Sequence, residues 1–467
     1  MPNPSQPPAP RALSDRPYVV ALAGMAALAA AMGIGRFAFT PLLPMMLSDG
    51  VITLVEGSWL ATANYVGYLL GALACMALPW VAPKARQRWH PARLARWGLA
   101  ATVLLTLAMA LPLPWAWAAL RFGAGVASAV VLLNIAAWCM LRLVALGQPA
   151  LGGLIFSGPG LGIALTGLSA SAMVAWHWPA AGGWAVFGLL CVALCALVWP
   201  VVQGLPQAAA AASSAPVANP PGLGPAARGV LTLAYGLAGL GYIVTATFLP
   251  VIARAALPAG SVWPDLFWPL FGMGVAMGAA LSTRAPVAWD RRWLLLVAYL
   301  LQAAAIGLSL VWPGVGGFAL GSWLLGLPFT AITFFGLQEA RRVWPSAGDS
   351  FTGLLTAAYG LGQIIGPPMV AWTLHRAATP SQGFTQGLVA AAAALLLGAV
   401  LYAVMVWRWP LRARRVRAAG FISPAPAVGA AQSRHRHRRG LRNARCRCVA
   451  RRWIAPAPAP GPRRPSV

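Results

Sequence analysis

Apolar residues form long unbroken runs along the chain, separated by short polar or proline-rich segments. The runs do not alternate apolar and polar residues, as the strands of an outer-membrane barrel do. A run of about 20 apolar residues is long enough to cross a bilayer as an α-helix. The pattern predicts twelve transmembrane helices, at 18–46, 57–82, 94–112, 114–141, 150–175, 180–202, 228–252, 263–282, 293–312, 314–337, 350–375 and 384–407.

The composition excludes a water-soluble protein. Of the 467 residues, 59% are hydrophobic and only 9% are charged, and the mean hydropathy is +0.71. A soluble domain carries about a quarter of charged residues, and a compact soluble protein this apolar would expose large apolar patches. The sequence therefore predicts an all-α integral membrane protein.

The positive charge of the chain lies almost entirely on one side of the predicted helices. The formal net charge is +27, and the segment 408–467 holds sixteen of the 34 basic residues and no acidic one. With the predicted helices alternating in direction, only Arg254 and Arg376 fall in loops on the side opposite the termini. Cytoplasmic loops collect Lys and Arg, so we expect both termini in the cytoplasm, a bacterial inner-membrane location and no nucleic-acid partner.

The second half of the chain repeats the first. GIGRFAFTPLLP at 33–44 recurs as GLGYIVTATFLP at 239–250, an offset of 206, and GLIFSGPGLG at 153–162 recurs as GLLTAAYGLG at 353–362. The second and eighth predicted helices also share a Gly-x-x-x-Gly pair. The repeats predict two pseudo-symmetric bundles of six helices in the same orientation.

The domain boundaries follow from this repeat. We expect an N-terminal bundle over 18–202 and a C-terminal bundle over 228–407. The uncharged Ala/Pro/Ser-rich segment before Arg228 is typical of a flexible linker, which we place at 203–227. We expect residues 1–17 and the basic tail 408–467 to be disordered cytoplasmic segments.

Two segments resemble a known transporter family. GIGRFAFTPLLPMM at 33–46 and ANYVGYLLGAL at 63–73 resemble the YbfB/YjiJ-type group of the major facilitator superfamily. The resemblance implies a monomeric secondary transporter, not an enzyme, that moves a small solute by rocker-switch alternating access and needs no cofactor or metal. The alternative is a membrane receptor or scaffold that retains the fold without transport.

Three superfamily motifs are present in part. Arg121-Phe-Gly-Ala-Gly125 resembles the R-x-x-Q-G motif, with alanine in place of glutamine. Gly158-Pro159 opens a segment that resembles the G-P-x-x-G-G motif of antiporters. The loop after the second helix lacks the usual acid, whereas Asp290-Arg291-Arg292 retains a fragment of the charged loop motif.

Two arginines, Arg36 and Arg121, lie inside the apolar runs of predicted helices, away from the helix ends. Burying an arginine in a bilayer costs at least about 2.5–3.5 kcal/mol, so such residues are candidates for function. Both fall in the outer half of their helices at similar depth. Arginine binds carboxylates bidentately, so we predict an anionic or carboxylate-bearing solute. A structural role remains the alternative for each, which for Arg121 is bonding to backbone carbonyls.

Other polar residues of the predicted helices are candidates for the same site, with helix–helix hydrogen bonding as the alternative. The remaining substrate-binding candidates are Tyr242, Asn64, Tyr68, Thr330, Thr333, Tyr359 and Gln363. The carboxylates near the outer mouth, which are candidates for coupling, are Asp49, Glu56 and Asp265. We place the other acids, including Glu339, in loops or the N-terminal tail. The residues expected to serve close packing or bending are Gly67, Gly71, Gly158, Pro159, Gly274 and Gly278.

Overall fold

The computed structural model describes residues 13–81, 90–204, 223–286, 288–344 and 348–410, and within these ranges the secondary structure is helical, without a strand. The expectations for residues 1–12, for most of the linker (205–222) and for the basic tail from residue 411 onward lie outside the described residues. All of the described residues belong to one compact unit.

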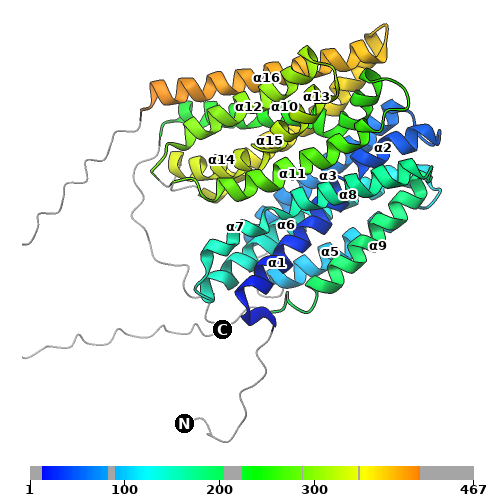
Figure 1. Cartoon of the computed structure of the whole chain (residues 1–467). Helices are drawn as coiled ribbons and strands as arrows, with labels where there is room; N and C mark the ends of the chain where they lie inside the picture. Colours follow the sequence, from blue (N-terminus) through cyan, green and yellow to red (C-terminus); the bar gives the residue numbers. More distant parts are fainter. Residues whose placement is uncertain (1–12, 82–89, 205–222, 287, 345–347, 411–467) are drawn as a thin grey trace, which may run out of the picture. The chain divides into compact units, whose positions relative to one another are not determined.

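Each predicted transmembrane helix coincides with one helix or with a broken series of helices (Figure 1). The elements of the first half are η1 (Leu13–Asp15), α1 (Pro17–Leu28), η2 (Ala29–Arg36), α2 (Phe39–Ser48), α3 (Leu54–Val81), α5 (Pro91–Ala108), α6 (Pro114–Ala145), η3 (Pro149–Leu151), α7 (Gly152–Ile155), α8 (Gly158–Ala175) and α9 (Ala180–Val198). Those of the second half are α10 (Pro225–Ala256), α11 (Trp263–Ser282), α12 (Arg291–Val311), α13 (Val315–Gly326), α14 (Phe329–Val343), α15 (Gly348–Arg376) and α16 (Pro380–Arg408).

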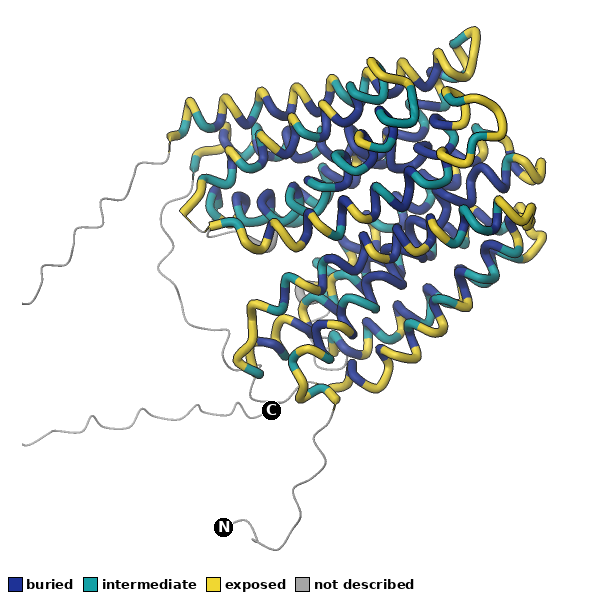
Figure 2. Tube along the Cα trace, in the orientation of Figure 1, coloured by how far each residue is buried: buried dark blue, intermediate teal, exposed yellow. Residues whose placement is uncertain are grey.

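Eleven helices or helix series in the described ranges are long and apolar enough to cross a membrane. α5 is not among them; it has 18 residues and carries Arg93 and Arg96 near its start. Large apolar side chains such as Leu104 and Leu197 are 67–68% exposed, and Figure 2 shows buried residues on the inner faces of the helices and exposed ones on the outer faces. Apolar outer faces of this kind suit a lipid environment.

The first transmembrane segment is interrupted where the sequence is rich in glycine. Residues Ala29–Arg36 form a π-helix between α1 and α2. Wide π-turns of this type occur mostly at functional sites. A Cβ at Gly33 would lie 2.5 Å from the Gly162 Cα, so the glycine lets this segment approach α8. The interruption places Arg36 at the last position of the π-helix.

Glycines allow close helix contacts at matching places in the two halves. A Cβ at Gly67 of α3 would lie 2.0 Å from the Phe122 carbonyl oxygen of α6, and one at Gly278 of α11 would lie 1.7 Å from that of Leu327. Gly71 and Gly274 are similarly close to a neighbouring backbone, as is Gly158 to the Met25 carbonyl oxygen. Pro159 lies in the first turn of α8, directly after the break that separates α7 from α8.

The two halves of the sequence meet along two helix pairs. α8 packs against α11, and α3 packs against α15 (Figure 1). In the first pair, a Cβ at Gly160 would lie 2.4 Å from the Ala276 backbone nitrogen. A shorter contact joins α2 to α10. The central residues described below lie between these pairs.

Two expectations about chain ends and loops are wrong. Residues 13–17 are not disordered: Leu13–Asp15 form a 3-10 helix, because Arg142 donates to the Ser14 carbonyl and pairs with Asp15. Glu339 is not in a loop but inside α14, with a side chain that is 0% exposed. The helix continues past its predicted end because Glu339 pairs with arginines, so the charged residues can stay helical and buried.

Candidate functional site

Arg36 connects the two halves of the chain. Its side chain is 2% exposed, and its Nη2 donates to the Gln363 Oε1 of α15 over 2.7 Å. The Gln363 Nε2 in turn donates to the Tyr242 hydroxyl of α10 over 2.5 Å. The three residues come from three helices, and the chain of hydrogen bonds crosses from the first half to the second.

The guanidinium of Arg36 is otherwise surrounded by aromatic rings. Its central carbon lies 3.7 Å from the Tyr68 ring centre, 5.3 Å from that of Phe37 and 5.4 Å from that of Tyr65. A cation over an aromatic face is attracted by the ring quadrupole. Within the part of the chain that the structure describes, Arg36 takes part in no ion pair. No carboxylate among the described residues therefore balances its positive charge by an ion pair.

Arg121 holds the backbone that carries Arg36. It is 1% exposed, and its Nη1 and Nη2 donate to the carbonyls of Gly35 and Arg36 over 3.2 and 2.8 Å. Carbonyls at the end of a helix lack hydrogen-bond donors within the helix, and Arg121 donates to two of them. Asn64 donates to the Arg121 carbonyl over 2.9 Å. These contacts correspond to the backbone-bonding alternative for Arg121 and make it a positioning residue.

Further aromatic residues extend from this network into the second half. The Tyr242 ring is stacked on the Tyr359 ring at 5.8 Å and meets the Phe329 ring edge-on at 4.9 Å. Thr330 and Thr333 lie half-buried on α14, and the Thr333 hydroxyl donates to the Thr330 carbonyl of its own helix. The structure thus brings together seven of the nine predicted substrate-binding residues, and it shows no contact that joins the two threonines to Arg36.

Two contacts between the halves were not predicted from the sequence. The Thr40 hydroxyl donates to the Ala246 carbonyl over 2.8 Å, and the hydroxyls of Tyr65 and Thr247 lie 2.8 Å apart. Ala246 is the residue that matches Thr40 in the repeat at offset 206. Residues related by a two-fold axis touch only at that axis, so the repeat alignment itself contained the signal. Arg36 and Tyr242 also match each other at offset 206, and Gln363 bridges them by hydrogen bonds.

The three acidic coupling candidates each have a local partner. Asp49 accepts from the backbone nitrogen of Ala180, the first residue of α9, over 2.7 Å. Glu56 accepts from the Thr53 amide and hydroxyl at the start of α3. Asp265 forms an ion pair with Arg254. None of the three contacts Arg36 by a hydrogen bond or ion pair that the structure describes.

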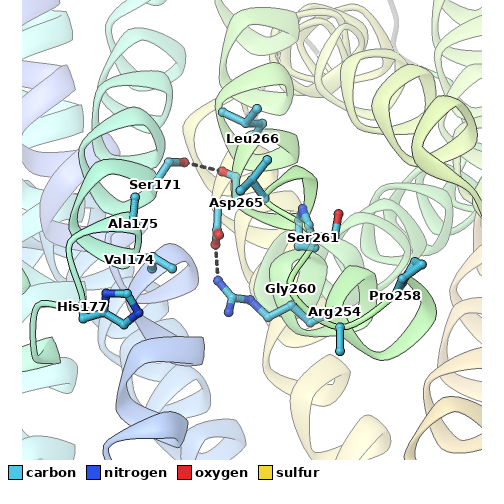
Figure 3. A pocket seen from close by; sticks show the side chains of 13 residues that line it. Ser171, Val174, Ala175, His177, Arg254, Pro258, Gly260, Ser261, Asp265 and Leu266 are labelled. Atoms are coloured by element: carbon cyan, nitrogen blue, oxygen red, sulfur yellow. Dashed lines mark hydrogen bonds and ion pairs between the residues drawn. The ribbon is translucent and has the colours of Figure 1, made fainter.

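A cavity of about 570 Å³ lies beside the Arg254–Asp265 pair, at the end of α8 and the loop between α10 and α11. Figure 3 shows the side chains of Arg254 and Asp265 pointing toward each other, and Ser171 directed toward Asp265. Ser171 donates to the Asp265 carbonyl over 2.9 Å. Arg254 and His177 also line a smaller cavity of about 310 Å³ beside Asp49. Both cavities are on the predicted outer side and do not include Arg36.

A third buried arginine, Arg292, has acidic partners. Its Nη2 lies 2.7 Å from the Asp290 Oδ2 and its Nε 3.9 Å from the Glu339 Oε1, while its Nη1 donates to the Met405 carbonyl of α16 over 2.9 Å. Burial alone raises the pKa of Asp290, but the hydrogen bonds and charge of Arg292 hold that pKa below its ordinary value. This cluster contains the fragment of the charged loop motif that was identified in the sequence.

The described residues contain no group of three His, Cys, Asp or Glu side chains placed to hold a metal ion. The side chains around Arg36 offer a guanidinium, hydrogen-bonding groups and aromatic faces. Such groups can bind and release a solute.

Comparison with known proteins gives a family and a fold. The family model described as "Uncharacterised MFS-type transporter YbfB" matches residues 28–403. Two solved structures of the nucleoside transporter NupG are similar, one of them of a point mutant. The mutant is 13% identical in sequence to this chain, and the other structure is 14% identical. Each has a TM-score of 0.62, and the matches cover 83% of this chain and 98–99% of NupG. No curated protein matches the sequence.

Proposed function

The chain belongs to the family of uncharacterised major facilitator transporters of the YbfB type, and from this premise we propose that Arg36 binds the carboxylate of a small solute. Membership makes the chain a multi-pass membrane protein and a secondary transporter, not an enzyme. The proposal concerns the chemistry of the solute and the way in which it is moved.

One observation carries the proposal: the buried guanidinium of Arg36 has a neutral amide as its hydrogen-bonded side-chain partner. A carboxylate carries a negative charge that a neutral amide lacks, and it can engage two N–H groups of the guanidinium at once. An anionic solute would therefore gain more from Arg36 than Gln363 does. Tyr68, Tyr242 and Tyr359 would contact the body of the solute, and Thr330 and Thr333 would add hydroxyl groups.

Transport would follow from the position of Arg36 between the halves. We propose that the helices before and after the linker form two six-helix bundles, over 18–202 and 228–407, which rock about the α8–α11 and α3–α15 contacts. The contact of Thr40 with its repeat mate Ala246 supports a pseudo-two-fold axis at this place. The distribution of basic residues supports cytoplasmic termini and a bacterial inner membrane.

The test is a ligand panel on the purified full-length protein, read as a shift in melting temperature. The panel contains benzoate, lactate and succinate, the amines benzylamine and ethanolamine, and uridine. Only carboxylates should stabilise the protein, because a ligand that binds the folded state stabilises it by RT ln(1 + L/Kd), where L is the free ligand concentration. Arg36→Lys should weaken the shift and Arg36→Gln should abolish it.

The control is Arg376→Gln, which removes an exposed arginine that lies against Trp372 at the end of α15. It should leave the shift as in the wild type. Stabilisation by uridine or the amines but by no carboxylate would refute the proposed solute class, and so would a full carboxylate shift in Arg36→Gln.

A further inference from the structure

We propose that Gln363 is an internal acceptor that takes the place of the solute carboxylate on Arg36. The carrier can then change conformation without bound solute and catalyse net transport rather than obligatory exchange. This inference rests on the proposed function, because it assumes that Arg36 holds the solute. It assigns to Gln363 a role in the transport cycle that is separate from helix packing.

Gln363 is fixed so that its oxygen faces Arg36. The side chain is 2% exposed, and its two ends have different partners: the Oε1 accepts from Arg36, and the Nε2 donates to the Tyr242 hydroxyl. An amide nitrogen can only donate, an amide oxygen can only accept, and a guanidinium can only donate, so the bond from Arg36 selects the amide orientation. The Tyr242 hydroxyl, which can donate or accept, takes the bond from the Nε2 and holds the other end of the amide.

Gln363 and a solute carboxylate compete for the same donor. The guanidinium of Arg36 cannot move away freely, because Arg121 holds its backbone carbonyl and Tyr68 covers its face at 3.7 Å. Among the described residues the Arg36 Nε has no acceptor, so a carboxylate can bind the Nε and Nη2 bidentately. Nη2 is the nitrogen to which Gln363 is bonded, and in the proposed cycle the carboxylate takes that place. The neutral amide is the weaker partner, and displacement is therefore favourable.

The consequence concerns the conformation in which the halves close on Arg36. Burying an arginine without a hydrogen-bond acceptor costs free energy. If the solute were the sole acceptor for Arg36, this cost would oppose closure of the solute-free carrier. Gln363 supplies an acceptor from the opposite half of the protein. Closure, and with it the return of the carrier, therefore does not require the solute.

The first experiment measures a distance in solute-free protein. Spin labels are placed on Leu141 of α6 and Gly229 of α10, both exposed positions near the predicted cytoplasmic ends of the two halves, in a background without the native cysteines. In the conformation described here, Arg36 is buried against Gln363. The population of this conformation should fall by about tenfold or more in Gln363→Leu, because the variant loses a hydrogen bond to a charged group. Gln363→Glu should retain it. Gln302→Leu, a buried glutamine on α12, is the matched control and should behave as the wild type.

The second experiment uses proteoliposomes and whichever of benzoate, lactate or succinate stabilises the protein most. Efflux into solute-free medium is compared with efflux into medium that contains the same unlabelled anion. The wild type should show both, and the ratio of net efflux to exchange should fall by about tenfold or more in Gln363→Leu.

The outcomes separate this inference from the proposed function. An unchanged distance distribution in Gln363→Leu, or wild-type protein that only exchanges, would overturn the role of Gln363 while leaving a carboxylate transporter. If no panel carboxylate stabilises the protein, the proposed function fails, and the distance measurement alone decides whether Gln363 controls closure. A parallel loss of net efflux and exchange in Gln363→Leu would indicate a packing role and would also overturn the inference.

Discussion

Arg36 and Arg292 are both buried among helices, yet their surroundings differ in one respect. Arg292 lies beside two carboxylates, those of Asp290 and Glu339, and reaches the backbone at the end of α16. Arg36 lies among aromatic rings and bonds to the amide of Gln363. The first arrangement satisfies the charge within the protein. The second leaves it open to an anion, and this contrast distinguishes a structural arginine from a candidate binding residue.

The largest effect on stability is expected when the self-contained cluster is broken. Arg292→Gln would leave Asp290 without its ion-pair partner and the fully buried Glu339 with Arg342 alone. Because Arg342 still compensates Glu339, we expect a loss of about 3 kcal/mol, the lower end of the range for breaking a buried pair. Arg36→Gln leaves no buried carboxylate behind, so its melting temperature should change less. The measurement is the melting temperature and folded yield of the two variants in the same detergent. Equal losses for both would remove the proposed difference between the two sites.

A smaller effect is expected from filling the closest helix contact. In Gly278→Ala the new Cβ would lie 1.7 Å from the Leu327 carbonyl oxygen, so α11 and the end of α13 must separate. Overpacking of this kind costs about 1–3 kcal/mol. The control is Gly229→Ala, where no atom lies within 4 Å of the added carbon. Thermal unfolding that ranks the two variants equally would show that the close approach is not needed.

The smallest effect is a pH dependence at the edge of the Arg292 cluster. The pKa of Asp290 is lowered in the folded protein. The ionised carboxylate therefore contributes its full share of stability above the ordinary pKa near 4, and this share is lost as the pH falls through the lowered pKa. The carboxyl is partly exposed, so the contribution should stay below about 1 kcal/mol. Asp290→Asn should remove this part of the acid destabilisation when melting temperatures at pH 3 and pH 7 are compared. An unchanged difference would contradict the ion pair.

The sequence predicted the helices and the common depth of the two central arginines, because both depend on quantities that are local in the chain. The length of an apolar run sets a helix, and the position of a residue within it sets the depth. This reasoning placed Arg36 and Arg121 at one level, and the structure joins them through the Arg36 carbonyl.

The partners of the charged residues could not be predicted in the same way. Gln363 is 327 positions from Arg36 in the sequence, and the contact depends on how α15 is rotated against the first half. Glu339 was expected in a loop because a lone acid is not tolerated in a membrane helix, and only the fold shows that Arg292 lies beside it. Thr40 and Ala246 match each other in the repeat alignment, but the alignment alone does not show that matching residues touch.

The most direct test of the central claim compares benzoate with benzamide, which has nearly the same shape but no charge, by calorimetric titration of the purified transporter. The account predicts that the wild type binds benzoate more tightly than benzamide and that Arg36→Gln loses this preference, with a loss of benzoate affinity of about 2–5 kcal/mol. Equal binding of the two compounds by the wild type, or a preference for benzoate that persists in Arg36→Gln, would contradict it.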